Sequence, residues 1–452
     1  MIHKQVVNHR QIAWLVGSVL MTGMMISLLR SIVQVARMDA WFSQILPIFY
    51  AFLIAYVLSG LVEAYPGKNI FEILFIIGGK WIGGTINLLI LFYIWIILAL
   101  DIKVAADFLH ISLLPTTPME IILLVFVLLL MYYGKTSLEV AARVNEFYFP
   151  LFFIMWISLY FLLMNEYNVE RLEPILTSSL DRIVISNLFP LGVYGDIFLF
   201  GAFLHAIVEP RLFHAAMKHG IIIVGFMTTI LLLVLLGVLG FIIVGRLNFP
   251  IHILVQQIHV TDFLDRVEII LFSVWFPAFT TKVTVTYLAF LVGVGSFGGQ
   301  RHYNTFNAPC GWFMVVSSIL GFPNVVQNDQ FISYSLPMIV LGFQLPLALF
   351  LLIHVRSKNK GREQSLIPEG TKLYRFYRSM VWGTTVCLIG CVIVILIGDF
   401  LKDKSAIGGI VTALVYIALL LTALFTSYGE MQALNHGKQR LGKAKQAGTF
   451  RQ

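Results

Sequence analysis

Long uncharged apolar runs, separated by short polar stretches, cover most of the chain. The clearest runs are residues 83–100, 147–165, 221–245, 331–355, 379–398 and 405–429. A helix needs about 20 apolar residues to cross a bilayer, and each of these runs is close to that length. With weaker runs added, the pattern predicts an all-α polytopic membrane protein. Its twelve spans are expected near residues 12–36, 41–63, 84–108, 117–134, 146–165, 187–208, 219–245, 266–296, 309–326, 331–355, 379–399 and 405–429.

The composition excludes most other classes of protein. Of the 452 residues, 59% are hydrophobic and only 12% are charged, whereas a soluble domain carries about 25% charged residues. So few charges cannot build a water-exposed surface, which excludes a soluble, disordered or fibrous protein and makes the lipid bilayer the expected surrounding. The formal net charge of +8 is attributed to basic cytoplasmic loops, so we expect no nucleic-acid partner.

The distribution of Lys and Arg predicts how the spans are oriented. With the N-terminus in the cytoplasm, most of the 31 Lys and Arg residues fall on the cytoplasmic side, as the positive-inside rule requires. Both termini are therefore expected in the cytoplasm. We expect four parts: a ten-span permease-like core over 1–355, a basic cytoplasmic loop over 356–378, two additional helices over 379–429 and a basic cytoplasmic tail over 430–452.

Two predicted spans contain residues that interrupt a helix. The first includes Gly23, and the sixth contains Pro190, Gly192 and Gly195, followed by Asp196. Proline and closely spaced glycines disfavour a continuous helix. These spans begin two consecutive five-span blocks, and breaks at matching places in two halves are typical of an inverted-repeat transporter. The backbone groups freed at such breaks suit a zwitterion such as an amino acid. The alternative is a pair of kinked helices packed on small residues.

Lys282 lies near the middle of the eighth predicted span, where a charge is costly and needs a reason. It could serve as a tethered cation or as a proton-titrating group; alternatively, it is a structural lysine bonded to helix-end carbonyls. Asp196 follows the break in the sixth span. It could pair with Lys282, face the amine of a ligand, or cap the helix segment after Gly195. The sequence leaves these alternatives open.

The sequence lacks the motifs of enzymes and cofactor sites. It has no glycine-rich phosphate loop, no His/Cys spacing typical of a metal site and no Gly-x-Ser-x-Gly nucleophile elbow. We therefore expect no enzymatic activity, no cofactor and no metal.

Several motifs along the chain resemble those of a known family, and their order and spacing carry the resemblance. They are ARMDAWFSQILP, YPGKNIFEIL, GGKWIGG, PTTPMEIILL, YGKTSLEVAARVNEFYFP, NEYNVERLEPIL and FLDRVEIILFSVWFPAFTTKVTVTYLA. In these motifs the chain resembles the B-subunit, or permease subunit, of bacterial spore germinant receptors. That family is part of the amino acid/polyamine/organocation transporter superfamily. Its members typically end after ten spans, whereas two further helices are expected here.

The resemblance implies a fold, a location and partners. The implied fold is a leucine-transporter-type 5+5 inverted repeat with discontinuous helices 1 and 6, here with two more C-terminal helices. The implied location is the bacterial cell membrane and, in spores, the inner membrane. The implied partners are the germinant receptor A-subunit, a larger membrane protein, and the C-subunit, a lipoprotein. The implied ligand is a small nutrient, namely an amino acid, a sugar or a nucleoside, bound at mid-membrane. The predicted helix breaks favour the amino acid.

By position, the resemblance places the ligand pocket between the two broken helices, with Lys282 as an ion-coupling group or cation mimic. The expected ligand-binding residues are Met21, Thr22, Gly23, Met24, Met25, Leu191, Gly192, Val193, Tyr194, Gly195 and Asp196. Two functions remain open. One is a receptor subunit whose ligand triggers spore germination; the other is a proton- or sodium-coupled amino-acid transporter of the same superfamily. The resemblance favours the receptor.

Overall fold

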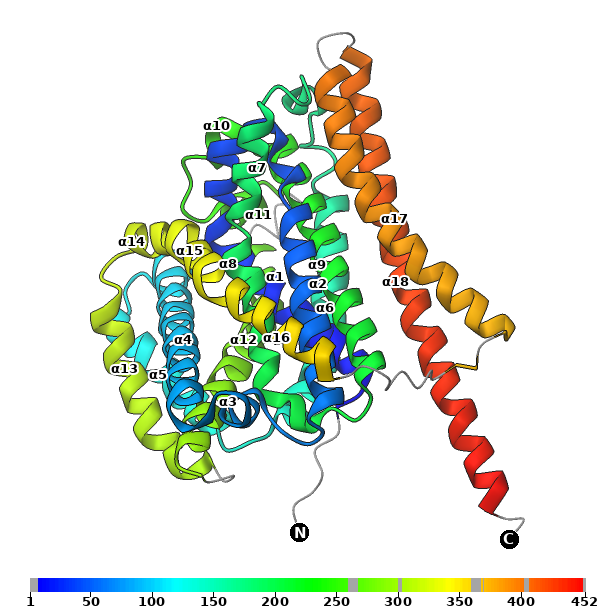
Figure 1. The fold of residues 1–452 in the computed structure, drawn as a ribbon. Coiled ribbons are helices and arrows are strands. Elements are labelled where there is room, and N and C mark those ends of the chain that lie inside the picture. The colour runs from blue at the N-terminus through cyan, green and yellow to red at the C-terminus, as the bar shows by residue number, and fades with distance from the viewer. Residues whose placement is uncertain are drawn as a thin grey trace.

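The fold is helical throughout. The computed structural model describes residues 7–258, 267–299, 303–358, 367–368, 370–401 and 406–449. In these ranges every regular element is a helix and no residue lies in a β-strand (Figure 1). The predicted all-α class is thereby confirmed for the described residues.

The first part of the chain forms long helices joined by short turns. Its elements are α1 (His9–Ala36), the 3₁₀ turn η1 (Arg37–Phe42), α2 (Ile45–Ala64), α3 (Ile70–Gly78), the π turn η2 (Gly79–Gly83), α4 (Gly84–Ser112), α5 (Met119–Tyr133) and α6 (Leu138–Leu162). Two asparagines start helices here: Asn8 caps α1 together with Gln11, and Asn69 caps α3 together with Glu72. Each pair forms a capping box, in which both side chains satisfy backbone N–H groups at the helix start.

The second part contains shorter and more interrupted helices. Its elements are η3 (Val169–Leu172), α7 (Leu180–Leu188), α8 (Leu191–Tyr194), the 3₁₀ helix η4 (Gly195–Ala206), α9 (Pro210–Leu239), α10 (Phe241–Val244), α11 (Pro250–Gln256), α12 (Val267–Phe297), η5 (Tyr303–Phe306), α13 (Asn307–Gly321), α14 (Val325–Gln330), the π turn η6 (Phe331–Ser335), α15 (Leu336–Ile339), the π turn η7 (Val340–Gln344) and α16 (Leu345–Lys358). Pro210 and Pro250 stand in the first turns of α9 and α11, where the N–H that proline lacks would have no helical partner.

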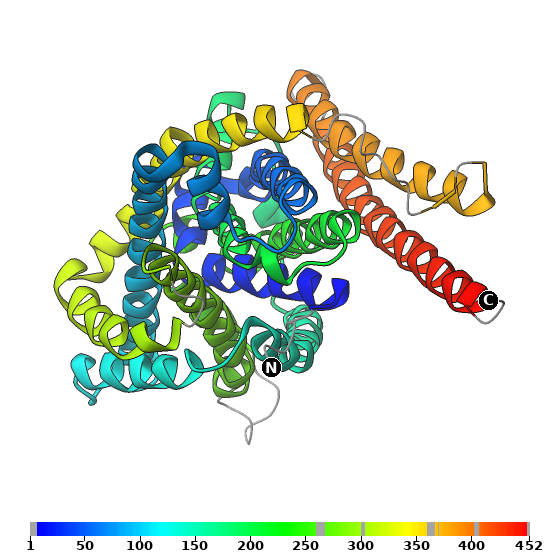
Figure 2. The ribbon, with the colours of Figure 1, turned by 60° about the horizontal axis from the view of Figure 1, so that its bottom comes forward.

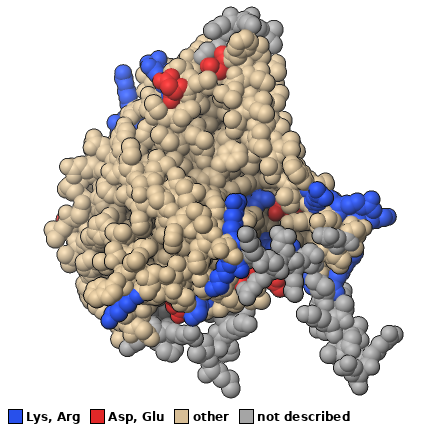
Figure 3. All heavy atoms as spheres, in the orientation of Figure 1, with Lys and Arg blue, Asp and Glu red and all other residues tan. Residues whose placement is uncertain are grey.

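Several of these helices, alone or joined end to end, form segments long and apolar enough to cross a membrane. Nine such segments occur among the described residues, and a tenth is obtained when the bent pair His9–Met25 and Leu28–Phe42 counts as one span. Figure 3 shows a broad area without charged side chains on one face, with Lys and Arg mainly over its lower part. The protein is therefore a multi-pass membrane protein. The number of twelve spans stays a prediction, because α5 and α13 have only 15 residues each.

Helix α1 occupies the middle of the bundle, where it packs against α6, α9 and α12 (Figures 1 and 2). Leu15, Val19 and Leu28 lie along its length and are completely buried. Because α1 has packed neighbours on several sides, a change in its bend would have to move other helices as well.

The last two helices, α17 (Lys372–Leu401) and α18 (Ala406–Thr449), form a hairpin along α9 (Figures 1 and 2). Helix α18 continues to Thr449, through most of the residues expected as a tail. Tyr416 of α18 is completely buried. Its ring packs edge-on against Trp41 and Phe42 of η1, at centroid distances of 5.6 Å and 4.9 Å. The hairpin thus contacts the turn that continues α1.

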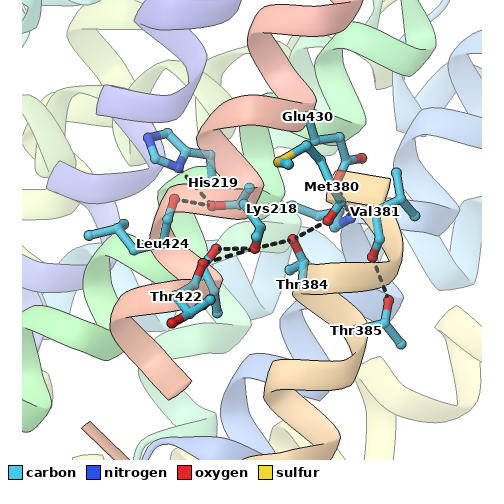
Figure 4. A network of polar contacts seen from close by, with 12 residues as sticks. Lys218, His219, Met380, Val381, Thr384, Thr385, Thr422, Leu424 and Glu430 are labelled. Carbon is cyan, nitrogen blue, oxygen red and sulfur yellow. Dashed lines mark hydrogen bonds and ion pairs between the residues drawn. The ribbon is translucent and has the colours of Figure 1, made fainter. Parts of the chain in front are cut away.

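Polar contacts fasten the hairpin to α9 (Figure 4). Lys218 Nζ lies 2.6 Å from Glu430 Oε2, and the two side chains are only 8% and 4% exposed. Beside this pair, His219 Nδ1 lies 2.9 Å from Ser427 Oγ. A buried charge that loses its partner is strongly destabilising. The ion pair therefore holds the hairpin in one position against α9.

Glu430→Ala should lower the free energy of unfolding by on the order of 3 kcal/mol, because the Lys218 ammonium would stay buried without its partner. Thermal unfolding of the full-length protein in detergent measures this loss. The matched control is Glu209→Ala, which removes an exposed pair with Lys438 at 3.9 Å, the two side chains being 29% and 45% exposed. The control should cost under about 1 kcal/mol. Equal destabilisation by the two variants would contradict a holding role for Glu430.

Candidate functional site

Of the two predicted helix interruptions, the one in the sixth predicted span is present as a break, and the one in the first is present as a bend in a continuous helix. Helix α1 bends by 67° between His9–Met25 and Leu28–Phe42, just after Gly23. In the sixth predicted span, α7 is followed by the single turn α8 and then by the 3₁₀ helix η4. Pro190 stands between α7 and α8, and the change from α-helix to 3₁₀ helix comes at Gly195. The sixth predicted span therefore departs from regular α-helical hydrogen bonding, whereas α1 remains one α-helix that is bent.

Lys282 of α12 meets two carboxylates beside these interruptions. Its Nζ lies 2.9 Å from Asp101 Oδ1 of α4 and 3.1 Å from Asp196 Oδ2 of η4. The Lys282 side chain is 2% exposed, and those of Asp101 and Asp196 are 13% and 3% exposed. Close opposite charges offset the cost of removing each group from water. Of the alternatives for Asp196, the structure shows the ion pair with Lys282.

Gly23 makes room for the lysine at the bend of α1. A Cβ atom at this position would lie 2.5 Å from Lys282 Nζ, closer than non-bonded heavy atoms approach. A side chain at residue 23 would therefore force Lys282 Nζ to shift from its present position between the two carboxylates. Lys282 Nζ thus lies against Gly23 at the bend of α1 and also pairs with acids of α4 and η4.

Uncharged polar groups extend the site on the other side of Asp196. Tyr93 Oη of α4 lies 3.4 Å from Asp196 Oδ1, and Tyr50 Oη of α2 donates to Gln344 Oε1 of η7 at 2.6 Å. Gly195 lies between these groups, since a Cβ there would be 2.9 Å from Gln344 Oε1 and 3.0 Å from Tyr93 Oη. The elements α2, α4 and η7 therefore meet at the break in the sixth predicted span.

The charges around Lys282 do not balance. One ammonium faces two carboxylates, and Asp101 Oδ2 finds no hydrogen-bond partner within the described ranges. A further cation or proton would neutralise the excess negative charge. No group of three or more His, Cys, Asp and Glu side chains in the described part of the chain is suited to hold a metal ion. The excess negative charge therefore suits a cation or a proton beside Lys282.

The predicted ligand-binding residues lie inside the protein but face several directions. Gly23 and Asp196 meet at Lys282, whereas a Cβ at Gly192 would face Leu336 of α15 at 2.9 Å. Met25 lines a small cavity with Trp275. Other predicted residues are at most 4% exposed, namely Met21, Thr22, Met24, Leu191, Val193 and Tyr194. Their role as ligand contacts stays a prediction.

Asp101 is a site residue that the sequence analysis did not single out. It is an acid inside an apolar run, and the cost of a charge at that depth is a signal that could have identified it. Tyr50, Tyr93 and Gln344 give no comparable signal, because isolated uncharged polar residues are ordinary in apolar helices. Only the packing of α2, α4 and η7 brings these three side chains to Gly195.

A family model described as "Spore germination protein" matches residues 6–326 of the chain. Three relatives come from Bacillus subtilis (strain 168). YfkT is 24% identical over 335 residues, which are 73% of this chain and 90% of that protein. Spore germination protein KB is 23% identical over 350 residues, 75% of this chain and 92% of that protein. Spore germination protein A2 is 24% identical over 343 residues, 71% of this chain and 87% of that protein.

A solved structure was also found to be similar. It is that of Mhp1, a nucleobase-cation-symport-1 family transporter in a closed conformation with bromovinylhydantoin bound. The similarity covers 96% of this chain and 97% of that chain, at 12% identity and a TM-score of 0.48.

Gly23→Ala should destabilise the protein by about 2–4 kcal/mol, because the new methyl group would push Lys282 away from two carboxylates that would stay buried. The melting temperature of the purified full-length protein, followed by intrinsic fluorescence, checks this. Gly342→Ala in η7 is the matched control, since a Cβ there meets nothing within 4 Å, and it should melt like the wild type. If the two alanine variants melt alike, Gly23 is not required for the position of Lys282.

Proposed function

Because this chain belongs to the family of spore germination proteins, we propose that it is the permease-like subunit of a spore germinant receptor. In this proposal it binds a small nutrient, an amino acid, at mid-membrane, and binding triggers germination. Its partners are the A-subunit, a membrane protein, and the C-subunit, a lipoprotein. The relatives named spore germination proteins KB and A2 support this assignment.

The observation that carries the proposal is the position of Lys282 between Asp101 and Asp196, at the break of one helix and the bend of another. Burying three charges together costs free energy of desolvation. Apolar packing would hold the helices together as well without that cost. Charges inside a membrane bundle are by default a mark of function. The excess carboxylate suits the ammonium of an amino acid, while Lys282 and freed backbone N–H groups suit its carboxylate.

The same geometry supports a way for the ligand to act. An incoming ammonium would compete with Lys282 for Asp196, and the ligand carboxylate would compete with both acids for Lys282. Either exchange loosens a contact that ties the bend of α1 to α12. A ligand shifts a conformational equilibrium only through its differential affinity for the two states, and this exchange supplies such a difference. Partner subunits would then respond to the changed position of α1. This mechanism requires no net transport.

The proposal includes a leucine-transporter-type arrangement of two inverted five-span repeats, followed by the hairpin α17–α18. It is supported by the bend of the first predicted span and the break of the sixth, which are the positions where the two repeats would begin. The proposed location is the spore inner membrane with both termini in the cytoplasm. The gathering of Lys and Arg over the lower part of the molecule in Figure 3, at the end where α18 finishes, supports that orientation.

Deletion of the gene should abolish germination of spores in response to one amino acid, because the receptor would lose its ligand-binding subunit. Uptake of that amino acid by growing cells should be unchanged. The experiment scores spore germination against a panel of amino acids, sugars and nucleosides, beside uptake of the same compounds, and a reintroduced wild-type gene is the control. Normal germination with lost uptake would mean that the chain is a transporter and not a receptor subunit.

A further inference from the structure

The turn between α3 and α4 exposes a tryptophan. This turn, the α3–α4 corner, is the π turn Gly79–Gly83. Trp81 is 85% exposed and Ile82 is 66% exposed, and no other large hydrophobic side chain in the described ranges is as exposed as Trp81. Lys80 is also exposed and forms no ion pair with a described residue. The corner thus presents one positive charge and two apolar side chains to its surroundings.

Glycines and a side-chain hydrogen bond shape this corner. Gly79 has a φ of +67°, a backbone conformation that favours glycine. A Cβ at Gly83 would collide with the carbonyl oxygen of Leu74, so the backbones of α3 and α4 meet too closely for a side chain. Thr85 Oγ1 donates to the carbonyl oxygen of Trp81 at 3.0 Å. The corner is therefore a defined turn, and its shape directs the exposed side chains outward.

The position of the corner fits the edge of a bilayer. Helix α3 lies across the lower end of the bundle (Figure 1), the end over which Lys and Arg gather (Figure 3). Helix α4 has 29 residues, which is more than the about 20 that a span needs, so the corner is not needed to cross the membrane. The exposed apolar side chains Leu88, Leu89 and Phe92 follow the corner on α4. They suit lipid tails, and the corner before them comes at the level of the headgroups.

The side chains of the corner match the chemistry of the headgroup layer. Tryptophan is enriched where bilayer and water meet, because its ring is apolar and its N–H is polar. A lysine there keeps its stem along apolar groups and extends its ammonium toward the phosphates. The cytoplasmic leaflet carries anionic lipids that attract such a charge. One cation beside two apolar side chains therefore complements the boundary between anionic headgroups and acyl chains.

We propose that the α3–α4 corner is an anchor that binds an anionic phospholipid of the cytoplasmic leaflet. Trp81 and Ile82 insert at the boundary between headgroups and acyl chains, and Lys80 pairs with the lipid phosphate. Phosphatidylglycerol is a lipid of this class. The anchor goes beyond the proposed binding of a nutrient and does not require it.

Helix α3 connects the anchor to the elements that carry the buried charges. A Cβ at Gly201 of η4 would lie 3.0 Å from Ile70 Cδ1 of α3, and a Cβ at Gly293 of α12 would lie 2.7 Å from Phe71 Cζ of α3. Helix α3 therefore packs closely on both η4 and α12, whose side chains pair at Lys282. A lipid that holds the corner at the membrane surface restrains α3 and, through it, the inner ends of these two elements.

The test measures quenching of Trp81 fluorescence by brominated lipids around the full-length protein in phosphatidylcholine nanodiscs. The difference between the wild type and Trp81→Phe isolates the signal of this one tryptophan. Both brominated phosphatidylglycerol and brominated phosphatidylcholine should quench it, because Trp81 faces lipid. Half-quenching should need about fivefold less phosphatidylglycerol, which corresponds to about 1 kcal/mol for one lysine at an anionic surface. The preference should shrink in 1 M salt, where the Debye length is about 3 Å.

Charge variants identify the residue that selects the lipid. Lys80→Gln should abolish the preference for phosphatidylglycerol, and Lys80→Arg should keep it. The matched control is Lys135→Gln, which removes an exposed lysine from the turn between α5 and α6 and should leave the preference at Trp81 unchanged. If Trp81→Phe does not fold, Trp81→Tyr replaces it as the reference.

Two results would overturn the proposal. Equal quenching of Trp81 by the two lipids would mean that the corner selects no anionic headgroup. Absence of quenching by either lipid would place Trp81 in water, where a protein partner and not a lipid would cover it. Neither result bears on the proposed nutrient receptor, because the measurement uses no nutrient and no spores.

Discussion

The buried ammonium of Lys282 is the constraint on which the arrangement of the site depends. In a low-dielectric interior its charge must be balanced within a few ångströms, and Asp101 and Asp196 do so from two other segments. The same requirement explains Gly23, because a side chain there would collide with the ammonium. One charge thus fixes the bend of α1, the middle of α4, the start of η4 and α12 relative to one another. A ligand that replaced Lys282 at Asp196 would separate η4 from α12 and leave the pair of Lys282 with Asp101.

A second buried ion pair, Lys218–Glu430, positions the C-terminal hairpin in a comparable way. The family model ends at residue 326, and the three relatives cover at most 75% of this chain but at least 87% of their own length. The hairpin therefore lies outside the family match. Through Tyr416 it contacts Trp41 and Phe42, which follow the bent helix α1. It is thus placed where a movement of α1 would reach it.

Features that depend on a residue type at one place in the chain could be predicted from the sequence. Gly23 and the segment from Pro190 to Gly195 mark the interruptions, and the cost of an intramembrane charge draws attention to Lys282 and Asp196. Their pairing was one of several alternatives, because the sequence does not fix how α12 is rotated toward η4. Contacts such as Tyr50 with Gln344, or Asn328 with Asp107, could not be predicted, since uncharged partners far apart in the chain leave no pattern. The number of spans is equally hard to predict, because α5 and α13 are shorter than a typical membrane helix.

The most direct test of the account is nutrient-triggered germination of spores that carry Lys282→Ala, with and without added propylammonium. The truncation removes the cation and leaves space between Asp101 and Asp196 that a small amine can enter. The account predicts that the variant loses its response to the nutrient and regains part of it with propylammonium, but not with the uncharged propanol. A normal response of the variant spores without any amine would contradict the central role of this charge.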